Sequence, residues 1–277
     1  MTKIRPTVAD KRRTFRRLHE AGCFVIPNPW DAGSALYLQS LGFKALATTS
    51  SGFAWSQGRP DGGVGRDTVL AHMASLVAAT DVPVNADFEA GFASDAAGVA
   101  ASVTLAVATG VAGLSIEDAT GDVANPLYDL SSAIDRIRAA RTAIDTAGAE
   151  VILVGRAECF LVGRPDLEET IDRLRAYAKA GADCLYAPGL QRTEHIAAVV
   201  AAVAPKPVNL LIGTASELTL RDIAALGVRR VSVGGALARS AWGAFMRAAT
   251  LIAQEGRFDA FAEAAAGRDL NGFYRGP

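Results

Sequence analysis

One pattern repeats eight times along the chain and constrains the fold more than any other feature. A segment with helical spacing ends at a glycine or a proline-containing turn, and a short run rich in β-branched residues follows. The runs cover residues 23–27, 45–49, 84–87, 114–118, 151–156, 184–188, 208–212 and 231–235. Strands that alternate with helices form a parallel sheet through right-handed crossovers, and eight strands close a barrel. The pattern therefore predicts an α/β fold, a (β/α)8 TIM-type barrel.

An open, doubly wound parallel sheet is the alternative that the same alternation allows. The first strand-to-helix turn, PNPWDAGSA at residues 27–35, lacks the G-x-G-x-x-G sequence of dinucleotide-binding sheets. A chain of 277 residues, half of them hydrophobic, is sufficient for one barrel. We expect a single α/β barrel domain over residues 1–277, with an opening helix at 10–21, the barrel at about 20–240 and extra helices at about 241–277.

The charge and cysteine content exclude several classes of partner. Lys and Arg (28) nearly balance Asp and Glu (29), so the net charge of −1 gives no attraction for nucleic acid or an anionic membrane surface. No run of about 18 apolar residues predicts a membrane span. The three cysteines are scattered, without the spacing of a zinc site or a disulfide framework. These features predict a cytoplasmic protein.

Polar side chains concentrate at the carboxyl-terminal ends of the middle strands, where barrel enzymes place their catalytic groups. They are Asp61 after the second run, Asn85 and Asp87 in the third, Glu117 and Asp118 in the fourth, and Arg156 and Glu158 in and after the fifth. Asn85 and Asp87 are two residues apart, so they face the same side of their strand. We expect both to point into one cavity.

Carboxylates from adjacent strand ends repel one another unless a cation neutralises them. Oxygen ligands without a nearby His or Cys favour Mg²⁺ or Mn²⁺ over zinc. For Asp87 or Glu117 alone, capping of the following helix is an equally good explanation. Together, and beside Arg156, they indicate a site.

The positions of lysine and histidine narrow the chemistry. None of the five lysines stands at the carboxyl-terminal end of a predicted strand, so a Schiff-base mechanism is not expected. The three histidines fall in helical segments. A metal is then the expected electron sink: it would stabilise the enolate of a 2-keto acid, and Arg156 would hold the carboxylate through two hydrogen bonds.

Four segments resemble the isocitrate lyase and phosphoenolpyruvate mutase superfamily over about residues 12–250. DVPVNADFEAGF (81–92) resembles its Asp-x-Asp-x-Gly-Tyr-Gly motif, and GVAGLSIED (110–118) resembles its Glu-Asp motif on strand four. The segment 154–183, beginning VGRAECF, resembles its arginine motif on strand five, and 30–61 matches the stretch that ends in a metal-side aspartate.

The resemblance implies an enzyme that binds a small α-keto acid with Mg²⁺ or Mn²⁺. The implied metal residues are Asp61, Asn85, Asp87 and Glu117, and the implied catalytic residues are Arg156, Glu117, Asp61 and Glu158. The implied substrate-binding residues are Thr49, Ser50, Ser51, Arg156, Asn125 and Asn209. It also implies a homotetramer in which a helix after the barrel is exchanged between subunits.

Two departures from the family pattern affect the expected reaction. Asn85 stands where the leading aspartate of the strand-three motif is expected, so one negative charge is missing at a metal position. The loop after strand four, ATGDVANPLYDL (119–130), lacks the Cys, Lys and His of the lyase branch. We therefore do not expect isocitrate or methylisocitrate cleavage. For a phosphonyl group, this loop offers only Asn125.

Three functions remain. The leading hypothesis is C–C cleavage or decarboxylation of an oxaloacetate-like or substituted 2-keto acid through a metal-stabilised enolate. The alternative is a phosphoenolpyruvate mutase-like or phosphonopyruvate-cleaving enzyme that acts on a P–C bond, and a further alternative is a non-catalytic keto-acid-binding protein. Separately, Gly213, Gly234 and Gly235 either bind a phosphate, as in many barrels, or permit tight turns and close packing.

Overall fold

The computed structural model describes residues 5–275, and its eight strands are all parallel. They are β1 (Phe24–Ile26), β2 (Leu46–Ala47), β3 (Val84–Asp87), β4 (Gly113–Glu117), β5 (Ile152–Arg156), β6 (Cys184–Tyr186), β7 (Val208–Leu211) and β8 (Arg230–Ser232). Each overlaps one of the eight predicted runs. The strand order is β1-β8-β7-β6-β5-β4-β3-β2, and a hydrogen bond of 3.0 Å from Ala47 N to Pro27 O links the two ends of the sheet. The predicted (β/α)8 barrel is confirmed.

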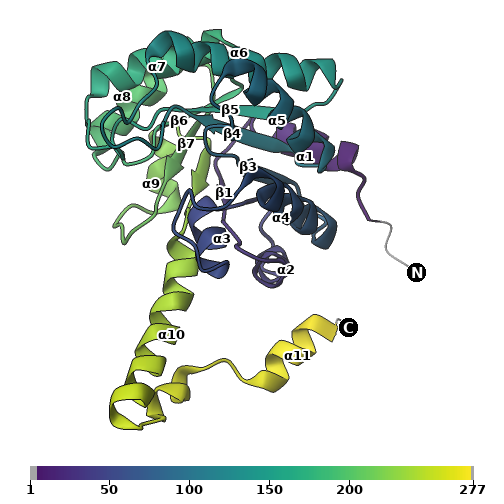
Figure 1. Ribbon diagram of the computed structural model, residues 1–277, viewed down its shortest axis with the longest axis vertical. Helices are drawn as coiled ribbons and strands as arrows, with labels where there is room; N and C mark the ends of the chain where they lie inside the picture. Colours follow the sequence, from purple (N-terminus) through teal and green to yellow (C-terminus); the bar gives the residue numbers. More distant parts are fainter. Residues whose placement is uncertain (1–4, 276–277) are drawn as a thin grey trace. The chain divides into compact units, whose positions relative to one another are not determined.

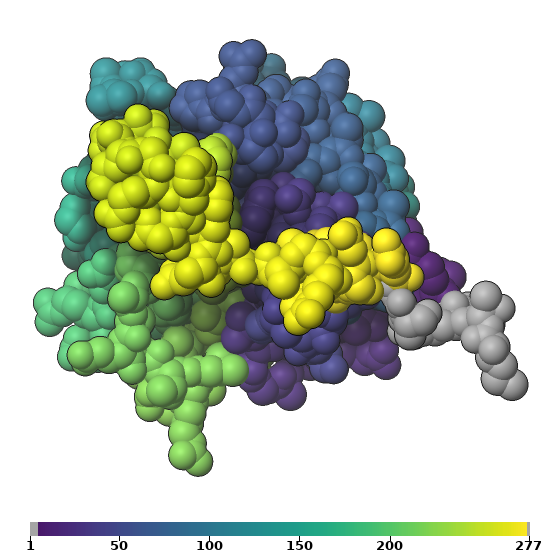
Figure 2. Space-filling view, turned by 90° about the horizontal axis from the view of Figure 1, so that it is seen from below, coloured from purple at the N-terminus to yellow at the C-terminus, as the bar shows by residue number. Residues whose placement is uncertain are grey.

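Nine helices of the described chain accompany these strands (Figure 1). They are α1 (Val8–Leu18), α2 (Ala32–Ser40), α3 (Ser50–Ser56), α4 (Arg66–Ala79), α5 (Ala96–Ala108), α6 (Leu130–Thr146), α7 (Leu167–Lys179), α8 (Thr193–Val203) and α9 (Leu220–Ala225). An aspartate side chain caps the first turn of α2, α5, α6 and α7. Seen from below, the colours of this part follow one another around the molecule, as expected when successive elements are neighbours (Figure 2).

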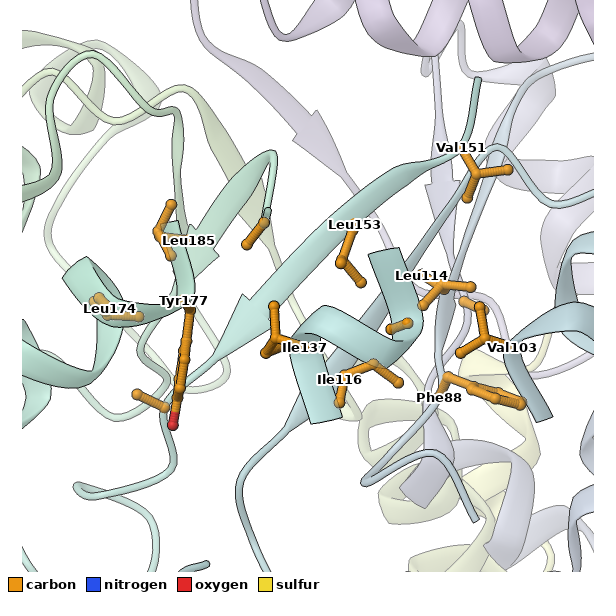
Figure 3. Packing of buried hydrophobic residues seen from close by; sticks show 14 of the residues in the cluster. Phe88, Val103, Leu114, Ile116, Ile137, Val151, Leu153, Leu174, Tyr177 and Leu185 are labelled. Atoms are coloured by element: carbon orange, nitrogen blue, oxygen red, sulfur yellow. The ribbon is translucent and has the colours of Figure 1, made fainter. Parts of the chain in front are cut away.

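Alternation along each strand divides the core into two layers. Leu114 and Ile116 of β4 face outward and pack with Val103 of α5 and Ile137 of α6 (Figure 3). Residues of the opposite parity, such as Val154, point into the barrel and form a separate, smaller cluster. Because the inward apolar layer is small, it does not fill the barrel interior. Polar side chains near the carboxyl-terminal ends of the strands can therefore line a cavity there.

Helix α1 packs against the inward layer. Its Phe15 is fully buried among the inward residues, and His19 stacks edge-on against Phe15 with ring centroids 4.6 Å apart. Asp10 and the capping residue Thr7 fix the start of this helix through a reciprocal pair of hydrogen bonds. The opening helix predicted at 10–21 is therefore present, and its aromatic face helps to fill the barrel interior.

The chain divides into two compact units after Ala236. The second unit contains α10 (Ala236–Glu255) from Leu237 onward, a 3-10 helix (Asp259–Glu263) and α11 (Gly267–Arg275). It exposes large apolar side chains, including Phe245, Met246 and Phe258. Exposed apolar surfaces of this kind often mark interaction sites. Helix exchange between subunits, which the family resemblance implies, stays a prediction. No helix in residues 5–275 is both long and apolar enough to cross a membrane.

Candidate active site

A cavity of about 180 Å³ lies at the carboxyl-terminal ends of the strands, where the strand-end residues were expected to gather. Of the predicted site residues, those lining it are Thr49, Ser50, Ser51, Asp61, Asn85, Asp87, Arg156 and Asn209. Glu117 and Glu158 do not line the cavity, but both contact Arg156. The structure thus brings together all but one of the predicted residues, and the exception is Asn125.

Arg156 is the centre of the charged residues. Its Nη1 lies 3.2 Å from Asp87 Oδ1 and 3.0 Å from Glu117 Oε2, and its Nε donates to Glu158 Oε1. Its guanidinium also lies over the ring of Tyr186, 5.1 Å from the centroid. Burial alone would lower the pKa of Arg156, but Glu117 and Glu158 outweigh it and hold that pKa above its ordinary value.

The expected two-bond grip of Arg156 on a substrate carboxylate is not available without rearrangement. Nη1 and Nε are already used by protein carboxylates, whereas no residue of the described chain pairs with Nη2. Nη2 is therefore the guanidinium nitrogen that is left for a ligand.

Backbone and hydroxyl groups orient Asp87. Its Oδ2 accepts a hydrogen bond from Ser50 N at 3.1 Å, and its own backbone N donates to Thr48 Oγ1 at 2.8 Å. The segment 49–51 was expected to hold the substrate with backbone amides. Here the Ser50 amide is occupied by Asp87, and Thr49 caps α3 by accepting from Gly52 N at 3.2 Å. The Ser51 hydroxyl lies 3.2 Å from the Thr49 hydroxyl, within the cavity lining.

Asp118, the neighbour of Glu117, has a structural role. Its carboxylate accepts hydrogen bonds from Glu158 N at 2.8 Å, Arg173 Nη1 at 3.1 Å and Tyr177 Oη at 2.5 Å. It is 2% exposed and does not line the cavity. Asp118 therefore joins the loop after β5 to helix α7 and fixes the position of Glu158.

Glu89 joins Asp61 and Asp87 in an acidic cluster that the sequence reasoning had not assigned. Burial first, then repulsion from Asp87 and Asp61, raises the pKa of Glu89 to about 7. Asp61 is exposed at the mouth of the cavity, yet the surrounding protein atoms and Asp87 raise the pKa of its carboxyl. Burial also raises the pKa of Glu117, against the lowering effect of Arg156. One guanidinium therefore faces more carboxylates than it can neutralise.

A strained turn places Glu89 in this cluster. Glu89 has φ +47° and Phe92 has φ +53°, in the left-handed region that non-glycine residues rarely adopt. The buried Arg136 holds this turn by donating to Ala90 O at 2.5 Å and Ala93 O at 2.8 Å. Glu89 O also accepts from Glu117 N at 3.1 Å, which ties the turn to the end of β4.

A different alignment of the strand-three motif with the sequence points to Glu89. The motif Asp-x-Asp-x-Gly-Tyr-Gly, begun at residue 87, aligns with Asp87, Glu89, Gly91, Phe92 and Ala93. Begun at residue 85, it meets Asn85 and places Glu89 and Ala90 at the Gly and Tyr positions. The later register keeps both acidic positions, and it removes the need for Asn85 to act as a metal ligand.

The acidic cluster has the chemistry of a hard-cation site. Mg²⁺ is usually held by one or two carboxylates, the substrate and several waters. In residues 5–275, no three His, Cys, Asp or Glu side chains are arranged to hold a metal directly. Asp87 as the contact residue, with Asp61, Glu89 and Glu117 around its waters, fits this pattern. Burial, with added repulsion from Asp87, raises the pKa of both Glu89 and Asp61.

Asn85 and Asn209 lie deeper in the barrel. Asn85 Oδ1 is 3.4 Å from Arg230 Nη1, and its Nδ2 donates to Ala86 O at 3.1 Å. Asn209 Oδ1 accepts from Arg230 Nε at 2.8 Å, while its Nδ2 donates to Ser232 Oγ at 3.0 Å. Both amides therefore orient Arg230, a residue that the strand-end argument did not select.

Asn125 lies away from the cavity, whereas Gly234 and Gly235 are part of its lining. Asn125 is in an exposed loop, where it donates to Asp122 Oδ2 at 3.3 Å. The backbone amides of Val233 and Gly234, in the turn considered for phosphate binding, each donate a hydrogen bond of 2.9 Å to Asn28 Oδ1. A β-carbon on Gly235 would lie 2.7 Å from Ser51 Oγ, so that glycine permits close packing. These contacts favour the packing interpretation of the glycines.

Comparison with known proteins gives one consistent family. The sequence profile described as phosphoenolpyruvate phosphomutase matches residues 15–253. A crystal structure of a protein from Burkholderia cenocepacia J2315, named as a provisional lyase/mutase, is 49% identical, with a TM-score of 0.94 and 98% of each chain covered.

Two further comparisons carry a named activity. An oxaloacetate decarboxylase from Chromohalobacter salexigens is 30% identical over 243 residues, which is 83% of this chain and 81% of that protein. The structure of an oxaloacetate acetylhydrolase with its product oxalate is 26% identical, with a TM-score of 0.85 and coverage of 97% of this chain and 94% of that one.

Proposed function

Because the chain belongs to the phosphoenolpyruvate phosphomutase family of the isocitrate lyase superfamily, we propose that it cleaves a C–C bond of a small oxaloacetate-like 2-keto acid with the help of Mg²⁺ or Mn²⁺. That it is an enzyme of the lyase and mutase type follows from its relatives. The substrate class, the bond and the metal are the proposal.

One observation carries the proposal: a carboxylate cluster and the free nitrogen of a buried guanidinium share one small cavity. Asp87, Asp61 and Arg156 all line it, and Nη2 of Arg156 has no partner among the described residues. A 2-keto acid has a carboxylate for the guanidinium and a carbonyl oxygen for a cation. Held by Asp87 and its neighbours, Mg²⁺ would supply Lewis acidity at that carbonyl oxygen.

The residues of the chain then have distinct tasks. Arg156 binds the substrate carboxylate, and Asp87, Glu117 and Glu158 keep its guanidinium in place. Ser50 orients Asp87 through its backbone amide. The carboxyl of Glu89, whose pKa is raised to about 7, is suited to exchanging protons with water or product near neutral pH. The pKa of the Asp61 carboxyl is raised in the same direction, chiefly by burial.

Oxaloacetate is the first substrate to test, because related proteins named for it share the fold and the family. Its C–C cleavage gives either pyruvate and CO₂ or, with water, oxalate and acetate, and NMR separates these products. We expect turnover with Mg²⁺ or Mn²⁺, loss of turnover in EDTA, and a large loss in Asp87→Asn. The matched control is Asp122→Asn, a change in the exposed loop after β4, which should retain activity.

Phosphonopyruvate belongs in the same panel. The loop that would have to bind a phosphonyl group supplies Asn125, which is exposed and bonded to Asp122. Release of phosphate from phosphonopyruvate, with no turnover of oxaloacetate, would replace the proposed function by P–C cleavage.

A further inference from the structure

Arg230 of β8 is a buried cation with neutral partners. It is 3% exposed and forms no ion pair with any residue in the range 5–275. Its Nε donates to Asn209 Oδ1 at 2.8 Å, and its Nη1 lies 3.4 Å from both Asn85 Oδ1 and His19 Nε2. Burial lowers the pKa of His19 to about 3, so its ring is neutral and can accept from Arg230.

A buried guanidinium without a counter-charge is costly, because neutral dipoles replace only part of its hydration. Arg156, in the same cavity, has three carboxylate partners. The chain therefore neutralises one of its two inward arginines and leaves the other without an anion. An unpaired charge of this kind points to a ligand of opposite charge.

The cavity is the route by which such a ligand reaches Arg230. Arg230 is part of the cavity lining, and no described residue pairs with its Nη2. On the other side, His19 and the fully buried Phe15 of the α1 region pack into the barrel interior. An anion that enters from the mouth of the barrel can therefore meet Nη2.

The neighbouring wall offers further hydrogen-bond donors. Ser232 and Tyr186 line the cavity beside Arg230. Ser232 Oγ accepts from Asn209 Nδ2 at 3.0 Å and also shares a hydrogen bond with the Tyr186 hydroxyl, so this pair of hydroxyls keeps one proton for another acceptor. Burial raises the pKa of Tyr186 to about 12, so its phenol stays protonated. β6, β7 and β8 thus contribute a hydroxyl donor and one positive charge to the lining, whereas Asp87 comes from β3 and Asp61 from the segment after α3.

We infer that Arg230 binds the distal carboxylate of the substrate and selects for dicarboxylic acids. The choice of a 2-keto acid rests on the proposed function, but the carboxylate site does not depend on it. The cavity of about 180 Å³ is small, which suits a small dicarboxylate better than a nucleotide or a sugar phosphate.

Succinate and oxalate are the probes, because neither has to be turned over. Succinate has two carboxylates separated by a carbon spacer, whereas oxalate is too short to reach both walls and should use the Mg²⁺ and Arg156 side. Calorimetry with the Mg²⁺-loaded protein should show succinate binding about 10- to 100-fold weaker in Arg230→Gln than in wild type, with oxalate binding unchanged. Arg230→Lys should retain part of the succinate affinity. Equal succinate affinity in wild type and Arg230→Gln would overturn the inference.

Wild type alone provides a second test if Arg230→Gln does not fold. Succinate should raise the melting temperature more than its monoamide, succinamate, because only the second carboxylate supplies the missing charge. No difference between the two ligands would also overturn the inference.

Asn85→Asp tests the same site without removing Arg230. The new carboxylate would stand where Asn85 Oδ1 now lies 3.4 Å from Nη1, and it should act as an internal competitor. We expect a higher melting temperature and about 10-fold or greater loss of succinate affinity. Unchanged succinate binding in a folded Asn85→Asp protein would contradict the inference.

The two proposals fail in distinguishable ways. If no keto acid is turned over but succinate binds in an Arg230-dependent manner, the proposed function is wrong and the carboxylate site stands. If oxaloacetate is turned over and its KM is the same in wild type and Arg230→Gln, Arg230 is not the distal-carboxylate residue and the proposed function stands.

Discussion

Replacing Glu89 by glutamine tests the acidic cluster directly. The unfolded chain releases the Glu89 proton near its ordinary pKa of 4.5, whereas the folded, metal-free protein releases it near 7. Between these pH values the folded state binds more protons than the unfolded state. The free energy of unfolding must therefore fall as pH rises through this window, and the loss is complete above about pH 7.

The magnitude follows from the same two pKa values. The difference between 4.5 and about 7 corresponds to about 3 kcal/mol, because each pKa unit represents about 1.4 kcal/mol. Burial contributes most, and repulsion from Asp87 and Asp61 adds to it. Glutamine has nearly the same shape and cannot ionise. As the pH rises, the free energy of unfolding should therefore fall further in wild type than in Glu89→Gln, and the difference should be most of this value of about 3 kcal/mol.

Urea unfolding of metal-free protein near pH 5 and near pH 8 measures this difference. Glu217→Gln, a change in the exposed loop between β7 and α9, is the matched control and should keep the pH dependence of wild type. Added Mg²⁺ should reduce the difference between wild type and Glu89→Gln and should release protons near pH 7, which a weakly buffered titration detects. The same pH dependence in wild type and Glu89→Gln would refute the reasoning that this carboxyl is part of the cluster.

Four other substitutions test the remaining parts of the site and the barrel interior. Arg156→Ala should bind oxalate about 10- to 100-fold more weakly, since a charged hydrogen bond is worth about 2–3 kcal/mol, and calorimetry showing unchanged affinity would remove Arg156 from the site. Asp118→Ala should lose about 3 kcal/mol or more in urea unfolding, because it leaves the buried Tyr177 hydroxyl without its acceptor and removes one of the two carboxylates that pair with Arg173. Asp87→Ala should keep the metal-free protein within about 1 kcal/mol of wild type or stabilise it, because it removes one of several crowded carboxylates; a large loss would instead favour a purely structural role. Phe15→Ala should cost about 3–5 kcal/mol, and a loss below about 1 kcal/mol in thermal unfolding would show that α1 is not packed into the barrel interior.

Local periodicity was sufficient to predict the barrel but not every inward-facing residue. The two-residue repeat correctly placed Asn85 and Asp87 on the inner side of β3. The same repeat extends β8 back to Arg230, yet the predicted run began at Val231 because an arginine is seldom buried in a strand. Its burial depends on Asn209, Asn85 and His19, which come from three distant segments and cannot be paired from spacing alone.

Glu89 was missed for a related reason. It follows the end of β3, in a turn with positive φ, so strand alternation gives no information about where its side chain points. Arg136 of α6, which follows α5 and β4 along the chain, holds that turn. By contrast, Arg156 and Asp87 stand within regular strands, and their contribution to one cavity followed from strand ends alone.

The last strand of the barrel, β8, pairs with the first, β1, and this pairing affects how the chain folds while it is being synthesised. β1 pairs with β8, so the residues that pair with Phe24 and Ile26 are synthesised roughly two hundred residues later. The hydrogen bonds from Val233 and Gly234 to Asn28 also form only after β8 has been made. Until the ribosome has released the β8 segment, the edges of β1 and β7 stay open, and open edges invite pairing with other chains. A nascent chain that stops before residue 230 has neither a closed barrel nor the Arg230 side of the cavity. Premature termination late in the message should therefore yield aggregating fragments rather than weakened enzyme.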